Sequence, residues 1–549
     1  MSLGSGAAGA RRALPPAAGF RGILRDDALA RAVYSEGAGI ARAIPDAIAV
    51  PSSADDLSAL AEWATANEIT LIPRGSGSGM AGAATGSGVI VDCSRLTAIG
   101  PVDVERRTIR CEPGAIRANV DAAARVHGLR FPVDPSSGPF CTVGGMVATN
   151  AAGARSLCFG ATRSWVEAMK IILANGTAAQ LRRGTTPPAD PALQHLTNEV
   201  LPRWSGHAGL RHDVRKESSG YGIASASDPG DLVDVLAGSE GTLGMFAELE
   251  LRLAPVSPFT GSALAAFRSL DDATVAAGTA ALLGASACEL LDRTFLDLAR
   301  SASPIPIDAD CEAVLLIEAE GDSSGGAAAV IGAIADACGL AGATDVELAL
   351  APETERALWS LRHAASPMLA RLDPALRSMQ FIEDACVPLE SLPVYVRGVR
   401  AALEARQIRG VIFGHAGDAN VHVNPLIDVS RRGWRADISG VLDEVTALVA
   451  SLGGTLAGEH GDGRLRTPLM HRVWSEDAMR CFAEVKQALD PRGILNPGVK
   501  VPAAADRPLD QIKYDPELPP LPDEARAALD RVERDRAYAT FRLDLLAKR

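Results

Sequence analysis

Two residue types that commonly hold inorganic cofactors are scarce or poorly spaced in this 549-residue sequence. The nine cysteines never form a C-x-x-C pair, and their number is odd. A disulfide framework, a zinc knuckle and a cysteine-ligated iron–sulfur cluster therefore lose support, and a reducing cytoplasm suits the chain best. Histidine occurs only nine times, so a segment in which histidines gather is informative.

Positive charge is also in deficit. The chain has 54 Lys and Arg against 67 Asp and Glu, which gives a formal net charge of −13. Such a surface repels nucleic acid and anionic lipid head groups, so we expect neither as a partner. No apolar run reaches the roughly 18 residues that indicate a membrane helix. An anionic substrate would need local positive charge from Arg, Lys or a metal.

The chain is too long for one hydrophobic core and divides by pattern into four parts. Residues 1–24 carry three Arg and no acid. We expect a disordered start over residues 1–25, with an organellar transit peptide as the alternative. Residues 40–255 contain short strand-like runs and glycine-rich turns, whereas residues 260–500 contain longer alternating elements. Residues 501–549 form a Pro-rich tail with a charged terminal helix. The predicted fold class is α+β.

Periodicity and capping signals place the individual elements. The expected helices are residues 54–67, 116–127, 271–283, 325–338, 352–372, 389–406 and 523–548. The expected strands are residues 69–72, 88–92, 108–111, 169–173, 312–318, 379–385 and 410–413.

The glycine-rich segment 73–82 reads PRGSGSGMAG. Gly77, Gly79 and Gly82 formally match the dinucleotide fingerprint G-x-G-x-x-G, which requires a helix next and an acidic residue about 20 positions later. A glycine-rich turn and a strand follow instead, so that interpretation fails. We interpret the segment as a loop whose backbone N–H groups wrap an anion, with a flexible Gly/Ser loop as the alternative.

Two further segments are also rich in glycine and other small residues. Residues 133–160 contain DPSS, CTVGG and ATNAAG, and residues 238–244 read GSEGTLG. Three such loops predict a large, flat, polyphosphorylated ligand that the backbone approaches closely.

Three of the nine histidines lie in two short segments, FGHAGDANVHVN at 413–424 and AGEHGDG at 457–463. His415 and His422 flank a turn, so both can point into one site, and strand alternation puts His422 and Asn424 on the site face. With Glu459 they supply three ligands of the kind that bind zinc, Mn²⁺ or Fe²⁺, and they leave coordination positions of the metal open. The alternative is that the two histidines lie in a turn with their hydrogen bonds satisfied by the protein, beside a loop glutamate, and bind no metal.

Together these motifs resemble the vanillyl-alcohol-oxidase superfamily with its PCMH-type FAD-binding domain, in particular the D-lactate, glycolate and D-2-hydroxyglutarate dehydrogenases. The landmarks PRGSGSGMAG, DPSS, CTVGGMVATNAAG, KESSGYGI and GSEGTLG occur in the family's order over residues 40–500. The resemblance implies a two-subdomain FAD-binding domain followed by an α+β cap domain that carries the metal and substrate.

The resemblance also assigns the cofactor site. No His occurs before His127, which excludes a histidyl link from the first loop, so we expect non-covalent FAD. Residues 216–221 are expected near the flavin. The cofactor-binding residues implied are Arg74, Gly75, Ser76, Gly77, Ser78, Gly79, Met80, Asp134, Pro135, Ser136, Ser137, Cys141, Thr142, Gly144, Gly145, Thr149, Asn150, Ala151, Glu240, Gly244 and Asn496.

For the chemistry, the resemblance implies that His415, His422 and Glu459 bind a divalent metal, with zinc favoured, and that His460 is the general base. Arg362 matches the family's carboxylate-binding arginine, although a helix-borne arginine can equally be a solvated charge. Arg466 is a second candidate for that role.

The implied reaction is oxidation of a small D-2-hydroxy acid to the 2-keto acid, with hydride transfer to flavin N5. Some relatives have a lysine where this chain has Gln380, which puts a second contact to a longer diacid in doubt. The tail resembles a linker, so the electron acceptor is expected to be a separate iron–sulfur protein, a quinone or an electron-transfer flavoprotein. Two alternatives are a transferase like alkylglycerone-phosphate synthase, whose run of cap histidines is absent, and a non-catalytic FAD subunit.

Overall fold

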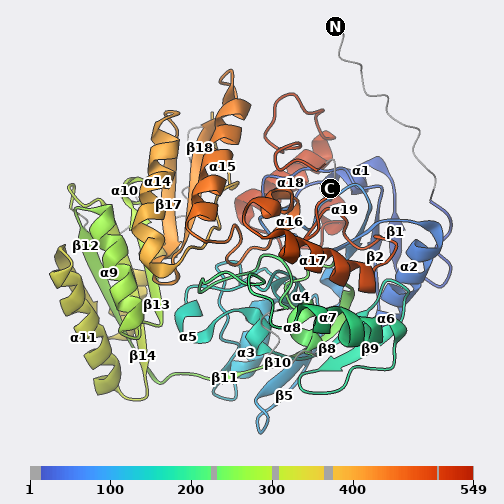
Figure 1. Ribbon diagram of the computed structural model, residues 1–549, viewed down its shortest axis with the longest axis horizontal. Helices are drawn as coiled ribbons and strands as arrows, with labels where there is room; N and C mark the ends of the chain where they lie inside the picture. The colour runs from blue at the N-terminus through green and yellow to red at the C-terminus, as the bar shows by residue number, and fades with distance from the viewer. Residues whose placement is uncertain (1–13, 224–230, 300–307, 364–374, 504–505, 548–549) are drawn as a thin grey trace.

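The structure is a computed structural model of the chain that describes residues 14–223, 231–299, 308–363, 375–503 and 506–547. It confirms the predicted α+β class. The described residues form three larger sheets and one small two-stranded sheet, and helices pack against them (Figure 1). Each larger sheet supports a different wall of one central cavity.

The first sheet has four strands in the order β1-β2-β4-β3 and is built from the N-terminal residues. β2 and β3 both run parallel to β4, and alternate strand residues are buried on opposite faces. Burial on both faces explains why these strands read as continuous apolar runs. The elements are β1 (Ile23–Arg25), β2 (Ala47–Val50), β3 (Leu71–Arg74), β4 (Val89–Asp92), α1 (Ala28–Val33) and α2 (Ala54–Asn67).

The second sheet is antiparallel, with the strand order β5-β6-β10-β8-β9, and its core is shared with several short helices. Its strands are β5 (Ile99–Asp103), β6 (Thr108–Cys111), β8 (Val166–Ile172), β9 (Ala178–Arg182) and β10 (Met245–Arg252). The helices of this core are α3 (Arg117–Arg125), α4 (Val143–Thr149), α6 (Pro191–His195), α7 (Leu201–Trp204), α8 (Leu232–Leu236) and α17 (Glu476–Leu489). The two-stranded sheet pairs β7 (Leu129–Arg130) with β11 (Ala254–Pro255).

The third sheet has seven strands in the order β15-β12-β14-β13-β17-β18-β16. They are β12 (Phe259–Phe267), β13 (Ala287–Asp292), β14 (Ala313–Gly321), β15 (Ala343–Ala349), β16 (Leu376–Ser378), β17 (Arg409–His415) and β18 (Asn420–Asp428). One face is covered by α9 (Leu270–Leu282), α11 (Ser324–Leu340), α14 (Leu392–Glu404) and α15 (Trp434–Ser451) (Figure 1). The other face packs on α10 (Arg293–Ala299) and α12 (Pro352–His363) and borders the cavity.

Strand alternation in β17 and β18 positions the histidines as predicted. The strands pair antiparallel, with Phe413 opposite His422. His422 and Asn424 border the cavity, whereas Val421 and Val423 belong to the core beneath the helices. The turn between the strands is a 3-10 segment that ends at Ala419, a left-handed residue with φ 53°.

Several element predictions are wrong. The strand expected at 379–385 does not form, since this segment runs irregularly along the sheet edge after β16. The helix expected at 523–548 is broken at Arg536, with φ 52°, into α18 (Asp523–Asp535) and α19 (Asp544–Ala547). Of the helix expected at 352–372, the part beyond His363 lies outside the described residues.

The ends of the chain also differ from expectation. Residues 1–13 lie outside the described residues, but Ile23–Arg25 of the supposedly disordered start is strand β1, paired with β2. The tail is not a loose linker, because α18 packs against α1 on the first sheet (Figure 1). Within the described ranges, no helix is both long and apolar enough to cross a membrane.

Candidate functional site

One cavity of about 1430 Å³ lies between the glycine-rich loops and the seven-stranded sheet. That is more than the roughly 300–1,000 Å³ of a typical small-molecule pocket, so it has room for a large cofactor and a substrate. Most of the cofactor residues predicted from sequence line it. They are Arg74, Gly75, Ser76, Gly77, Ser78, Gly79, Met80, Asp134, Pro135, Ser136, Ser137, Cys141, Thr142, Gly144, Gly145, Thr149, Ala151, Glu240 and Gly244.

The first glycine-rich loop presents unpaired backbone donors to this cavity. Within the described residues, none of the backbone N–H groups from Ser76 to Met80 donates to a protein acceptor. Gly77 has φ +71°, and the hydroxyls of Ser76 and Ser78 lie 3.0 Å apart at the same place. A run of free N–H groups in such a loop is an anion-binding concavity, which fits the pyrophosphate of a dinucleotide.

Arg74 is placed differently from its expected role. Its guanidinium is buried and donates to the carbonyl oxygens of Glu36 at 3.0 Å and of Tyr34 and Ala84, both at 3.2 Å. Burial lowers the pKa of this guanidinium. Arg74 therefore holds the loop in shape through backbone carbonyls, while the backbone of the loop faces the cavity.

Asn150 and Asn496, also expected to bind the cofactor, are not part of the cavity lining in the described structure. Both have positive φ, 52° and 44°. Asn496 Nδ2 donates to the carbonyl oxygens of Glu240 at 2.7 Å and Ala83 at 3.1 Å, and Asn150 Nδ2 donates to the carbonyl oxygen of Glu217 at 3.2 Å. They brace the loops from behind.

The structure brings the three predicted metal ligands together in the cavity wall. His415 Nε2 lies 3.1 Å and His422 Nε2 lies 3.3 Å from the same oxygen, Glu459 Oε1. All three side chains are buried, and the two imidazole rings are nearly perpendicular, at 82°. Two nitrogens and one oxygen that converge on one point can hold a divalent cation.

The far side of each imidazole is already occupied. His415 Nδ1 lies 2.5 Å from Glu289 Oε1, and His422 Nδ1 lies 2.8 Å from the carbonyl oxygen of Glu383. Such acceptors fix the tautomer in which Nδ1 carries the proton and Nε2 keeps its lone pair, as metal-binding histidines require. Burial lowers the pKa of His422, but hydrogen bonding to Glu383 and Glu459 outweighs it and raises the pKa to about 9.

The charges around these ligands do not balance. Glu459 Oε2 lies 3.0 Å from the buried Nζ of Lys216, which holds the carboxylate so that Oε1 faces the histidines. The ligand Glu459 and the side chains linked to the three ligands, either directly or through one intervening side chain, include five carboxylates and three cations. They are Glu289, Glu383, Asp384, Asp418 and Glu459, against Lys216, Arg362 and Arg466. With neutral imidazoles two negative charges remain, and a divalent cation would compensate them.

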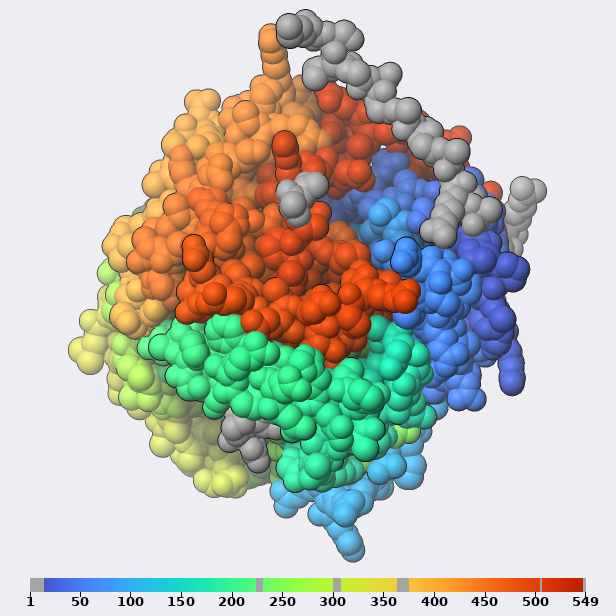
Figure 2. All heavy atoms as spheres, turned by 45° about the vertical axis from the view of Figure 1, so that its right-hand side comes forward, coloured from blue at the N-terminus to red at the C-terminus, as the bar shows by residue number. Residues whose placement is uncertain are grey.

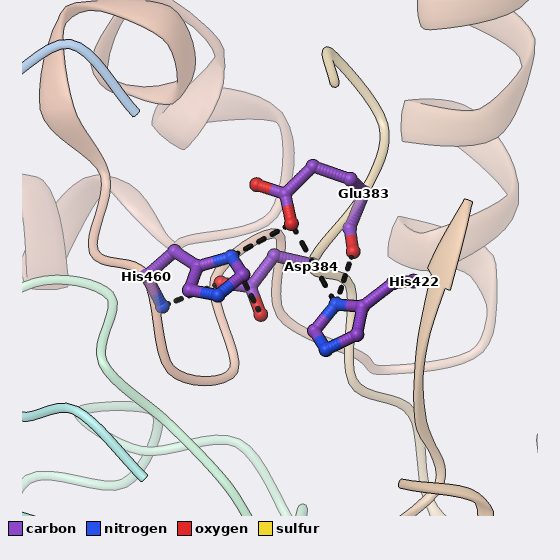
Figure 3. A group of neighbouring side chains, drawn as sticks. All are labelled: Glu383, Asp384, His422 and His460. Atoms are coloured by element: carbon purple, nitrogen blue, oxygen red, sulfur yellow. Dashed lines mark hydrogen bonds and ion pairs between the residues drawn. The ribbon is translucent and has the colours of Figure 1, made fainter. Parts of the chain in front are cut away.

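His460, the predicted base, sits beside the trio with its ring stacked on His422 at 5.2 Å between centroids. Its Nδ1 lies 2.7 Å from Glu383 Oε2, so the Glu383 carboxylate holds one nitrogen (Figure 3). Its Nε2 lies 3.6 Å from Glu459 Oε1. Burial lowers the pKa of His460, but Glu383 and Asp384 outweigh it and raise the pKa to about 9.

A second group of potential ligands, Glu383, Asp384, His422 and His460, shares this wall (Figure 3). Asp384 is already used, because its carboxylate accepts from the backbone N–H of His460 at 2.8 Å and of Glu459 at 3.1 Å. Glu383 is bound to Arg466 and His460. This group shapes the loop that carries Glu459, and the first trio is the better metal site.

The two arginine candidates separate clearly. Arg362 lines the cavity, with its Nε 2.5 Å from Glu289 Oε2 and its guanidinium over the Phe413 ring. Arg466 is buried away from the cavity, where it pairs with Glu383 and donates to the carbonyl oxygen of Gly461 at 2.6 Å. Arg362 therefore lies at the cavity surface, whereas Arg466 is held in the wall behind it.

Sequence reasoning missed the residues that orient the site, namely Glu289 and Glu383. Both are acids inside apolar strand-like runs, CELLD and FIEDAC, and a charged residue there is costly to bury without a partner. That signal could have singled them out. It would not have shown which histidine each one contacts, because those contacts join residues 39 to 126 positions apart.

Comparisons with known proteins match most of the chain to FAD-linked domains. Residues 258–499 match the family description "FAD linked oxidases, C-terminal domain", and residues 45–182 match "FAD binding domain". The glycolate oxidase subunit GlcD of Bacillus subtilis is 29% identical over 461 residues, covering 83% of this chain and 89% of that protein. A D-lactate dehydrogenase of Anaerostipes hadrus is 28% identical over 83% of this chain and 90% of its own length.

A D-2-hydroxyglutarate dehydrogenase of Pseudomonas putida is 29% identical over 87% of this chain, which spans about half of that longer protein. Among solved structures, 4-ethylphenol oxidase of Gulosibacter chungangensis superposes with a TM-score of 0.64 at 16% identity, covering 87% of this chain and 94% of that one. An alkyldihydroxyacetonephosphate synthase superposes with a TM-score of 0.58 at 15% identity, covering 86% and 82%. At these identities the likeness shows a shared fold.

Proposed function

This chain belongs to the FAD-linked oxidase family, and from that premise we propose that it oxidises a small D-2-hydroxy acid to the 2-keto acid. The proposed substrates are of the D-lactate, glycolate or D-2-hydroxyglutarate type, as the names of its relatives suggest. In this proposal residues 40–255 bind FAD without a covalent link, and residues 260–500 carry a divalent metal, zinc first, with manganese or iron as alternatives.

The observation that carries the proposal is the convergence of His415 Nε2, His422 Nε2 and Glu459 Oε1 in the wall of the cofactor cavity. A purely electron-transferring or scaffolding subunit has no need of such a site. Bound FAD would supply the hydride acceptor that the oxidation requires, and the metal would supply a Lewis acid for the hydroxyl and carboxylate oxygens.

The chain's own residues then divide the remaining work. His460, when its ring is neutral, takes up the hydroxyl proton at Nε2, since Glu383 holds Nδ1 and fixes the ring. Arg362 binds the substrate carboxylate, which a guanidinium matches in shape and charge. Gln380, which also lines the cavity, supplies no positive charge for the second carboxylate of a longer diacid.

Turnover requires that electrons leave the reduced cofactor. We propose a separate acceptor for this purpose, either an iron–sulfur protein, a quinone or an electron-transfer flavoprotein. Within the described residues the chain has no cysteine cluster that would hold an iron–sulfur centre of its own.

The test is a dye-reduction screen of purified FAD-loaded protein with D- and L-lactate, glycolate, D-malate and D-2-hydroxyglutarate. We expect activity on at least one D-acid or glycolate that is lost with a chelator and restored by Zn²⁺ or Mn²⁺. His422→Ala should remove it at unchanged FAD content. His212→Gln, a change at a half-buried histidine paired with Glu217 outside the cavity, serves as the control. Activity on none of the acids, or activity indifferent to the chelator and to His422→Ala, would refute the proposal.

A further inference from the structure

The C-terminal residues 506–547 lie beyond the matched family domain, which ends at residue 499. We call them the C-terminal segment. They contribute to the lining of the central cavity, among others through Lys513, Tyr514, Arg536 and Tyr538. A segment that had only to cover the first sheet would not need to reach this cavity.

Apolar residues anchor the C-terminal segment on the first sheet. Leu521, Ala525 and Val532 are buried against Ile48, Ile72 and other residues of that sheet's outer face. Figure 2 shows the red C-terminal residues against the blue N-terminal ones at the upper surface. The segment thus covers a sheet face that would otherwise expose isoleucine and valine to solvent. This apolar packing holds the segment in place without any contribution from the cavity.

The segment also contacts the second predicted cofactor loop directly and is linked to the first through Ala38. Lys513 Nζ lies 3.5 Å from the carbonyl oxygen of Ala38, whose own N–H donates to the carbonyl oxygen of Gly77 in the first loop at 3.0 Å. The Tyr538 ring lies 5.3 Å from the ring of Phe140 in the second loop, and the Arg536 guanidinium lies over the same ring. Aromatic contacts of this kind restrict how far the second loop can move.

On its other side the segment is tied to the third sheet and its helices. Arg435 of α15 forms an ion pair with the buried Asp515 and donates to the carbonyl oxygen of Leu509 at 3.1 Å. The Arg377 guanidinium, from β16, lies 5.8 Å from the Tyr514 ring centroid. Residues 511–513 meanwhile hydrogen-bond to Ile40 and Arg42 near the first loop, so this stretch joins both sides of the cavity.

We propose that the C-terminal segment is a built-in clasp that completes the FAD cavity and slows the release of FAD. Tyr514 and Tyr538 are its positioning residues, since they border the cavity and contact opposite walls. The inference rests on the FAD half of the proposed function. It does not depend on the hydroxy-acid half, because FAD release is measured without substrate.

The experiment is the rate of FAD release from the full-length holoenzyme after dilution, followed by the recovery of flavin fluorescence. We expect the double variant Tyr514→Ala, Tyr538→Ala to release FAD about tenfold faster than the native protein, whereas Tyr538→Phe keeps the native rate. Phe541→Ala is the matched control, because Phe541 packs on the same sheet without lining the cavity. We expect it to lower the melting temperature and leave the release rate unchanged.

A second pair of variants covers the case in which the tyrosine variants do not fold. Arg435→Asp should also accelerate release, and adding Asp515→Arg should restore it by re-forming the ion pair. Native release rates in the tyrosine double variant or in Arg435→Asp would overturn the clasp. An equal acceleration in Phe541→Ala would overturn it as well, because the segment would then act only through general packing. A protein that shows the expected release rates but oxidises no hydroxy acid would refute only the substrate part of the proposed function.

Discussion

The carboxylate of Glu289 is shared between a proposed metal ligand and the proposed substrate-binding arginine, which makes it a sensitive point of the site. It is fully buried, with one oxygen 2.5 Å from His415 Nδ1 and the other 2.5 Å from Arg362 Nε. Glu289→Gln preserves the size of the side chain but replaces one acceptor oxygen by an NH₂ donor. We predict that this change weakens metal binding.

Either orientation of the glutamine amide loses an interaction. If its oxygen faces His415, the NH₂ group meets the N–H of Arg362, donor against donor. If its oxygen faces Arg362, the NH₂ group meets His415 Nδ1 and favours the tautomer that is protonated at Nε2, which cannot bind a metal through Nε2. Loss of such an outer contact typically weakens metal affinity about 10- to 100-fold, and we expect a value in that range.

The assay is competition for Zn²⁺ or Mn²⁺ against a chromogenic chelator, combined with the KM for the best acid found in the dye screen. Glu250→Gln is the matched control, since that buried glutamate also bridges two cationic groups, Arg110 at 2.9 Å and Arg182 at 2.7 Å, away from the cavity. A metal affinity of Glu289→Gln within about threefold of the native value, where an outer contact predicts at least tenfold, would refute the assignment. The same follows if Glu250→Gln loses as much.

Three other predictions address the cofactor loop, the charge balance and the pH dependence. Gly77→Ala should weaken FAD binding at least about tenfold in a fluorescence titration, because the φ of Gly77 is +71° and the added Cβ would lie 2.3 Å from the Arg74 side chain. The control is Gly79→Ala, which should bind FAD normally because a Cβ added at Gly79 has no atom within 4 Å. Lys216→Met should lower the free energy of unfolding of the metal-free protein by about 3 kcal/mol, since it leaves the Glu459 carboxylate buried without its cation. Added metal should restore part of the lost melting temperature, and an equal loss with and without metal would contradict this prediction. Burial raises the pKa of Asp292 from 3.8 to about 7, so the folded state is penalised as pH rises from 4 to 7 and the penalty is constant above. Asp292→Asn should therefore stabilise the protein by up to about 4 kcal/mol at pH 8, and the gain in thermal melts should shrink toward pH 4; a gain independent of pH would contradict the assignment.

Local rules account for the elements that were predicted well. The helix at Ala54–Asn67 forms where the Ser53 cap and the acidic first turn indicated it, with Ser53 accepting from the N–H of Asp56. Strand β6 likewise has the predicted bounds, Thr108–Cys111. Capping and alternation act within a few residues, so one sequence contains all the information they need.

The irregular segment at 379–385 shows where local reasoning fails. Its composition predicts a strand, yet Glu383 interacts with His460 and Arg466. Asp384 accepts a hydrogen bond from the backbone of the loop at 459–460. Satisfying those buried groups outweighs the strand propensity of the neighbouring residues. The segment therefore serves the site, and its partners are distant in sequence.

The sequence by itself determined which residues make up the site. It contains two histidine segments flanked by glycines and a glycine-rich loop whose backbone N–H groups can bind an anion. Its net negative charge means that an anionic substrate needs local positive charge. The residue types and spacing of these segments limit the chemistry, and the family resemblance follows from the same motifs. Only the tertiary structure decided that Glu289 and Glu383 orient the histidines, that Arg362 rather than Arg466 faces the cavity, and that the C-terminal segment contributes to the cavity lining. These decisions depend on contacts between residues 39 to 490 positions apart, which no local pattern encodes.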